Sequence, residues 1–165
     1  MPDKLIYDRT AADVARVNEL MRKVRAGSAT DAEREEWLGG RMKGAWNASD
    51  LNRINDWLAY LTDFLEAQGY SAAVFLRHTP WTKADFPTRN DIDRIRRNVE
   101  ALQNCFFTLP DWHEIVYNGT MNFDQANVLE WDLGRIEIWL QELVKAASIR
   151  QANTLFMQAG GVFNA

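Results

Sequence analysis

The chain has 165 residues and a net charge of −4 at pH 7, with 47% hydrophobic and 25% charged residues. This length suits one domain or one elongated helical unit, and the composition excludes disorder over most of the chain. The negative charge argues against nucleic-acid binding, which requires a concentrated basic surface. We expect no membrane span, because no window approaches 18 consecutive apolar residues.

Two helices are predicted in the first 40 residues. The first covers about residues 11–25, where apolar residues recur at three- and four-residue spacing after the N-cap residue Thr10. A capping box formed by Thr30 and Glu33 predicts the start of a second, short helix that continues to Leu38.

A third helix is predicted over about residues 50–68, with Ser49 as its N-cap and Gly69 directly after its end. The pattern then breaks in an aromatic linker, residues 70–86. Its segment SAAVFLRH fits a short strand or a helical turn equally well. Residues 1–69 therefore form an N-terminal segment of three helices, followed by an irregular linker.

A fourth helix is predicted after Pro87, with Thr88 as its N-cap. We expect Trp81 and Phe86 to fold back on its first turns as a hydrophobic staple. Apolar residues follow in a heptad-like seam suited to pairing with another helix. The seam consists of Ile92, Ile95, Val99, Leu102 and Phe106.

The last predicted helix is the longest, covering about residues 123–155, with Asn122 as its cap and Gln125 as the capping partner. It continues the heptad-like spacing through Ala126, Leu129, Leu133, Ile136, Leu140, Leu143 and Ala147. Trp131, Ile138 and Trp139 lie off this seam, which indicates a helix that is central or is covered by a neighbouring chain. Residues 87–155 thus form a two-helix segment, and residues 156–165 form a flexible or docking tail.

The overall prediction is an all-α fold of about four helices, in which two long helices pack along heptad-like seams. No motif for catalysis, for a metal or for a cofactor is present, so we predict no catalytic residue, no metal ligand and no cofactor. Cys105 is interpreted as a buried thiol, and His78 and His113 as surface or loop-bracing residues. The carboxylates of the last helix would do acid–base chemistry only if one of them were desolvated. They are Glu130, Asp132, Glu137 and Glu142.

Four sequence blocks occur in a fixed order: DRTAADV, KGAWNASDLNR, a tryptophan followed by DFPTRND, and FDQANVLE. Together they resemble a family of small helical proteins encoded by phages and prophages of Gram-positive bacteria, among the tail and tail-fibre genes. The resemblance covers about residues 10–143. Its letters are caps, turns and aromatics, and Asn127 and Glu130 are interpreted as structural hydrogen-bonding residues that hold the loops of neighbouring helices.

The resemblance implies a non-enzymatic structural protein of the virion, made in the host cytoplasm: a tail or baseplate component or a tail-fibre connector. We expect it to bind other virion proteins and to form a homo-oligomer, such as a ring or a trimer. The predicted interface residues are Trp131, Trp139, Phe156 and Phe163. The main alternative is a phage-encoded adaptor or regulatory protein that binds a host protein, and a glycan hydrolase is a third.

Overall fold

The computed structural model describes residues 1–105, 111–115 and 121–160. Within these residues the fold is all-α, with five helices and no strand. The helices are α1 (Ala11–Arg25), α2 (Asp31–Gly39), α3 (Ala48–Ala67), α4 (Arg89–Gln103) and α5 (Phe123–Gly160). In the same residues, no helix is both long enough and apolar enough to cross a membrane.

The predicted capping chemistry starts four of the five helices. Thr10, Thr30 and Thr88 each form a capping box, in which the threonine oxygen accepts the N–H of the third helical residue. At the start of α5, the Asn122 and Gln125 side chains each accept the other residue's backbone N–H at 2.8 Å. These boundaries are confirmed.

Two predicted boundaries were wrong. Asn47, not Ser49, caps α3, because Asp50 lies three residues after Asn47 and accepts its backbone N–H at 2.9 Å. The Asn47 amide also donates to the carbonyls of Met42 and Ala45, which fixes the loop before the helix. The last helix continues to Gly160 instead of ending at Leu155.

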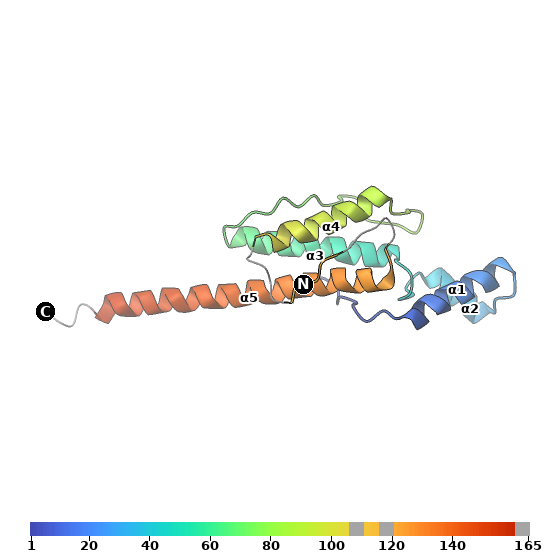
Figure 1. Cartoon of the computed structure of the whole chain (residues 1–165), viewed down its shortest axis with the longest axis horizontal. Helices are drawn as coiled ribbons and strands as arrows, with labels where there is room; N and C mark the ends of the chain where they lie inside the picture. Colours follow the sequence, from blue (N-terminus) through green and yellow to red (C-terminus); the bar gives the residue numbers. More distant parts are fainter. Residues whose placement is uncertain (106–110, 116–120, 161–165) are drawn as a thin grey trace.

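The five helices form an elongated molecule with three parts (Figure 1). We call α3, α4 and the first half of α5 the bundle, because these helices contact one another pairwise. We call α1 and α2 the hairpin, since they contact each other and make no comparable contact with the bundle. The hairpin lies at one end of the molecule, and the second half of α5 extends past the bundle at the other end.

The hydrophobic core lies inside the bundle. Trp57, Tyr60 and Phe64 form an aromatic cluster along α3, with ring centroids 5.6 and 6.2 Å apart. Residues from the seams of α4 and α5 complete the core together with the apolar face of α3. The fully buried aliphatic side chains of the bundle are Leu51, Ile54, Leu58, Leu61, Leu65, Val99, Leu102, Leu129, Leu133, Ile136 and Leu140.

The linker between α3 and α4 is neither a strand nor a helical turn. Three asparagine side chains each accept a linker N–H and donate to the carbonyl of the same linker residue, as a neighbouring strand would. The pairs are Asn98 with Phe75 (2.9 and 3.0 Å), Asn55 with Arg77 (3.1 and 3.3 Å) and Asn52 with Trp81 (2.7 and 3.0 Å). The linker is therefore an ordered extended segment held by helix side chains.

The two residues predicted to form a hydrophobic staple on α4 differ in burial. Trp81 is buried in the core, with the Arg77 guanidinium 3.8 Å from its ring centroid. Phe86 is 86% exposed, so its predicted role in the staple was wrong. Phe86 lies instead with Leu38 and Pro87 at the edge of an open depression beside the end of α2.

Candidate functional site

The first ten residues form an extended N-terminal segment that lies along α3 and α5. The Asp3 carbonyl accepts the Trp57 indole N–H at 2.7 Å. Leu5 is buried at the point where α5 carries Gly134, whose missing side chain leaves room for this close approach. These contacts fix the first half of the segment across the bundle.

A side-chain amide and a carboxylate of α5 hold the second half of this segment. Asn127 accepts the backbone N–H of Arg9 at 3.0 Å and donates to its carbonyl at 2.9 Å. Glu130 accepts the Ile6 N–H at 2.7 Å. The interpretation of Asn127 and Glu130 as structural hydrogen-bonding residues is therefore confirmed, and the segment that they hold is the N-terminal one.

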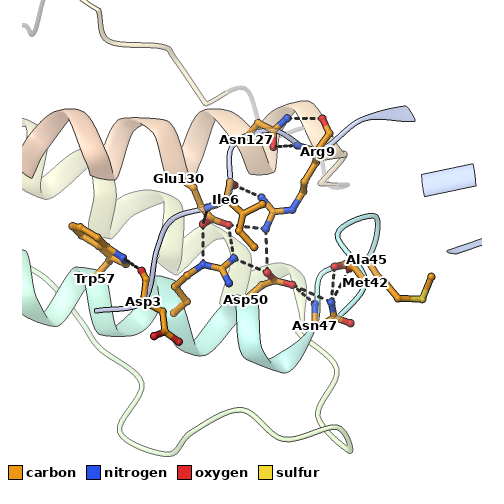
Figure 2. Close-up of polar contacts among 11 residues, drawn as sticks. Asp3, Ile6, Arg9, Met42, Ala45, Asn47, Asp50, Trp57, Asn127 and Glu130 are labelled. Atoms are coloured by element: carbon orange, nitrogen blue, oxygen red, sulfur yellow. Dashed lines mark hydrogen bonds and ion pairs between the residues drawn. The ribbon is translucent and has the colours of Figure 1, made fainter. Parts of the chain in front are cut away.

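Four charged side chains meet beneath this segment (Figure 2). Glu130, which is fully buried, accepts from Arg9 at 2.7 Å and from Arg53 at 2.9 and 3.0 Å. Asp50 accepts from the same two guanidinium groups, at 3.1 Å from Arg9 and 2.5 Å from Arg53. Two positive and two negative charges thus neutralise each other out of contact with water. Burial alone would lower the pKa of Arg53, but the hydrogen bonds to Glu130 and Asp50 raise it.

This network joins three of the four sequence blocks of the family resemblance. Arg9 comes from the first block, Asp50 and Arg53 from the second, and Asn127 and Glu130 from the fourth. We predicted a structural role only for the last two residues. The two arginines were missed, although Arg9 directly precedes the cap residue Thr10 and both lie in blocks that carry the resemblance.

The N-terminal segment and α5 enclose a groove of about 510 Å³. Its floor includes Leu5 and Trp57, and its rim includes Tyr7 and Trp131, whose rings meet edge to face at 5.3 Å. We call it the Trp131 groove. Tyr7 and Trp131 are 47% and 37% exposed, so the groove presents aromatic surface to solvent. Such a surface has the composition of a protein-binding site.

Residues 111–115 lie against α5 next to the Trp131 groove. Asp111 pairs with Arg135 at 2.5 Å, and the His113 ring lies 6.4 Å from the Trp131 ring, centroid to centroid. His113 is exposed, and its backbone N–H donates to the Asp132 carboxylate at 3.4 Å. These contacts match the prediction of His113 as a loop-bracing residue.

Asp132, like Glu130, is a carboxylate of α5 that the structure desolvates, but within the described residues no arginine or lysine pairs with it. It is fully buried, and within the described residues its second carboxylate oxygen has no hydrogen-bond partner. Burial raises the pKa of Asp132 to about 7, and the hydrogen bond from the His113 backbone only partly offsets this. The other two carboxylates of the predicted set lie in ordinary surroundings: Glu137 accepts from the Tyr60 hydroxyl at 3.4 Å, and Glu142 pairs with Lys145 at 2.7 Å.

The predicted interface residues do not form one cluster in the described structure. Trp131 is exposed on the rim of the groove. Trp139 is half-buried against the core, with its indole N–H buried and without a described partner. The Phe156 side chain and Phe163 lie outside the described residues. Tyr7 and Trp57 belong to the groove but were not predicted, because only the tertiary fold brings them beside Trp131.

The remaining candidates, His78 and Cys105, lie apart from the network and the groove. His78 is exposed, and Cys105 is half-buried, with its thiol donating to the Ala101 carbonyl at 3.4 Å. Burial raises the pKa of Cys105, which disfavours the reactive thiolate. Nowhere in residues 1–105, 111–115 and 121–160 do three or more His, Cys, Asp or Glu side chains group as a metal site would require.

Comparisons of the chain with protein-family models, with curated proteins and with solved structures gave no match. The resemblance to phage tail-region proteins therefore stays a prediction.

Proposed function

We propose that this chain is a non-enzymatic structural protein of a phage virion: a tail or baseplate component, or a connector for a tail fibre. The observation that carries the proposal is the second half of α5, which extends past the bundle (Figure 1). From residue 141 to residue 150, all side chains are exposed except Leu143 and Val144, which are half-buried. A helix that leaves its own domain in this way is suited to contact with a second protein.

The elongated shape supports a connector in particular. The hairpin lies at one end and the extension of α5 at the other, so the bundle separates two possible attachment points. With 38 residues, α5 is about 57 Å long at 1.5 Å per residue. A single helix of this length would therefore hold the bundle at a fixed distance from the protein bound at its far end.

Heptad-like pairing of the two long helices is part of this proposal. Its support is the burial of the seam from Ile92 to Leu102 in α4 and from Ala126 to Leu140 in α5; farther along α5, Leu143 is half-buried and Ala147 is exposed. Pairing of this kind would make the bundle stiff enough to act as a spacer.

Binding to other virion proteins and self-assembly complete the proposal. Exposed aromatic side chains such as Trp131 supply much of the binding energy at protein interfaces. Symmetric homo-oligomers are also the most common assemblies. The protein would be made in the host cytoplasm and then become part of the particle.

Mass spectrometry of purified particles tests this proposal. Peptides of this chain at a stoichiometry comparable to those of other tail proteins would support it. A matched control is a particle preparation from a phage with this gene deleted, complemented in trans by the intact gene. Tail assembly should fail without the gene and return with complementation.

The rival function is a phage-encoded adaptor that binds a host protein. It is favoured by the Trp131 groove, which is open and aromatic in the isolated chain. In that case the chain would be absent from purified particles and would co-purify from infected cells with one host protein. A Trp131→Ala variant would then lose that partner, and particle assembly would be normal.

A further inference from the structure

One face of α5 continues the Trp131 groove along the whole described helix. Trp131, Ile138 and Ile149 follow one another after seven and eleven residues, which is about two and about three helical turns. They therefore lie on the same face, which we call the α5 stripe. Trp131 and Ile138 line the groove, and Ile149 lies on the extension.

This surface collects most of the exposed apolar side chains. Of nine large hydrophobic residues that are exposed in the described chain, five lie in the groove or on the stripe. They are Met1, Tyr7, Trp131, Ile138 and Ile149. The other sizeable apolar depression, beside the end of α2, contains only Leu38 and Phe86 of this set. The groove and the stripe therefore expose more large apolar side chains than the depression beside α2, as a protein-binding surface does.

The extension of α5 also needs a partner for its own stability. Beyond Leu140, the last buried residue among the α5 side chains that the structure describes, the helix continues for about 30 Å at 1.5 Å per residue. An isolated helix of this length is marginal in water, because most helical stability in proteins comes from the packing of an apolar face. On the extension, Ile149 lies on the stripe, whereas the half-buried Leu143 and Val144 lie on the side of α5 that continues the core-facing seam.

We propose that two copies of this chain pair antiparallel along the α5 stripe, so that the extension of each copy lies in the Trp131 groove of the other. This inference rests on the self-assembly that is part of the proposed function. The groove spans positions 131–138 of α5, and the extension begins at 141 on the same helix. A two-fold axis at the level of Leu140 therefore places the extension of each copy over the groove of the other. Trp131 of each copy then lies opposite Ile149 of the other, a self-complementary and closed contact.

The charges beside the stripe favour the antiparallel arrangement. Arg135 and Glu142 are seven residues apart and lie on the same side of the stripe, and Lys145 lies on the other side. Antiparallel pairing brings Glu142 of one copy within about one turn of Arg135 of the other. Parallel pairing would instead place Arg135 of one copy opposite Arg135 of the other, and Glu142 opposite Glu142, where like charges repel.

The mass of the full chain, measured by size exclusion coupled to light scattering, tests the pairing. We expect twice the chain mass of 19.0 kDa. Ile149→Glu on the extension and Ile138→Glu in the groove should each give the monomer mass, and any loss of helix content by circular dichroism should be no larger than the extension accounts for. Leu38→Glu is the matched control, because Leu38 is 67% exposed, close to the 61% of Ile149, but lies on α2. A monomeric or trimeric full chain overturns the proposal, as does equal dissociation by Leu38→Glu.

Disulfide formation between two differently marked copies tests the orientation. In a Cys105→Ser background, a Lys4→Cys chain is mixed with a Lys145→Cys chain, since Lys4 lines the groove and Lys145 lies on the extension. Antiparallel pairing predicts mostly mixed dimers on oxidation. Mostly Lys145→Cys homodimers would mean a parallel pair and overturn the proposal. A monomer found in virions would refute this pairing alone, whereas a dimer absent from virions would refute the proposed function alone.

Discussion

In the hairpin, Leu20 and Ala29 are the only buried apolar side chains, and α2 has none. Among the described residues of the bundle and of the segments that lie against it, eighteen apolar side chains are buried. The two regions have similar capping boxes and similar charged residues. Their difference therefore lies in the apolar surface removed from water, which supplies most of the folding free energy.

The ion pairs of the two regions differ in the same way. In the hairpin, Arg16 pairs with Glu36 at 2.7 Å, and both side chains are about 40% exposed. In the bundle, the Arg9, Arg53, Asp50 and Glu130 side chains are at most 8% exposed. An exposed pair contributes little to stability, whereas a buried network is costly to break because each member leaves another charge unpaired. Ion pairs of the same kind therefore contribute little to stability in the hairpin and are costly to break in the bundle.

The largest expected effect is that of Glu130→Gln in the bundle. It leaves the Arg9 and Arg53 guanidinium groups facing Asp50 alone, and we expect a loss of about 3–5 kcal/mol in the free energy of unfolding. The measurement is urea unfolding followed by tryptophan fluorescence. Because Glu130 also holds Ile6, the N-terminal segment should become accessible to proteases first. An unfolding midpoint equal to that of the unmodified chain would show that the network does not stabilise the bundle.

Asp132→Asn should stabilise the bundle at alkaline pH. The unfolded pKa of Asp132 is about 3.8 and its folded pKa is about 7, so the folded state binds more protons between these values. Its contribution to the free energy of unfolding therefore falls as pH rises from 4 to 7 and stays low above 7. The shift corresponds to at most about 4 kcal/mol, and the unpaired amide of Asn reduces the gain to roughly 1–3 kcal/mol at pH 8.

Urea unfolding of both chains between pH 4 and pH 8 measures this effect. The difference between Asp132→Asn and the unmodified chain should be largest at pH 8 and should vanish or reverse near pH 4. A difference that is constant across this range would show that the Asp132 carboxyl group is not protonated in the folded state near neutral pH.

The packing of the loop before α3 against the start of α1 depends on Gly44. A Cβ at this position would lie 2.1 Å from the Asp13 carbonyl oxygen, which is backbone and cannot move aside. Gly44→Ala should therefore cost about 1–3 kcal/mol and displace the hairpin. Gly39→Ala is the matched control, since nothing lies within 4 Å of its added Cβ. Hydrogen exchange should speed up in α1 and α2 for Gly44→Ala only; uniform acceleration across the bundle would contradict this assignment.

The sequence predicts the helix starts well because capping is local. Thr88 and Asp91 are three residues apart, and their hydrogen bonds form in any context that allows a helix. Ser49 and Asn47 are both good cap residues by type. Asn47 is the cap in the structure because Asp50, three residues later, accepts its backbone N–H. Arg9 and Glu130, by contrast, are 121 positions apart. No local pattern indicates that contact, so the network appears only in the fold.

The Trp131 groove, too, could be predicted only where the signal is local. Trp131 was predicted to lie at an interface because it lies off the apolar seam of its own helix, which is a local signal. Tyr7 and Trp57 reach the groove through the course of the N-terminal segment, which buried charges and single amide side chains determine. The ordered linker was also unpredictable, because Asn52, Asn55 and Asn98 replace a strand that the sequence does not contain.

Acid should affect the hairpin in the opposite sense to Asp132. The hydrogen bond from Lys23, followed by that from the Thr30 backbone, lowers the pKa of Glu33 from 4.5 to about 2. The stabilisation from Glu33 is therefore fully present above pH 4.5 and is lost as pH falls toward 2. As pH falls toward 2, hydrogen exchange in α1 and α2, corrected for the intrinsic exchange rate, should therefore accelerate more in the unmodified chain than in Glu33→Gln. Parallel pH profiles for the two chains would show that the Lys23 pair has no role in the hairpin.

The smallest expected effect is that of Glu36→Gln, which removes the exposed partner of Arg16. The pair lies in water and holds two long side chains in one geometry, so we expect a loss below about 1 kcal/mol. That loss should shrink further at 1 M salt, where charges are screened within about 3 Å. Urea unfolding of Glu36→Gln and Glu130→Gln at low and high salt measures both. Because the Glu130 network is out of contact with solvent ions, its loss should change little with salt, and equal salt dependence of the two variants would mean that burial does not separate the two regions.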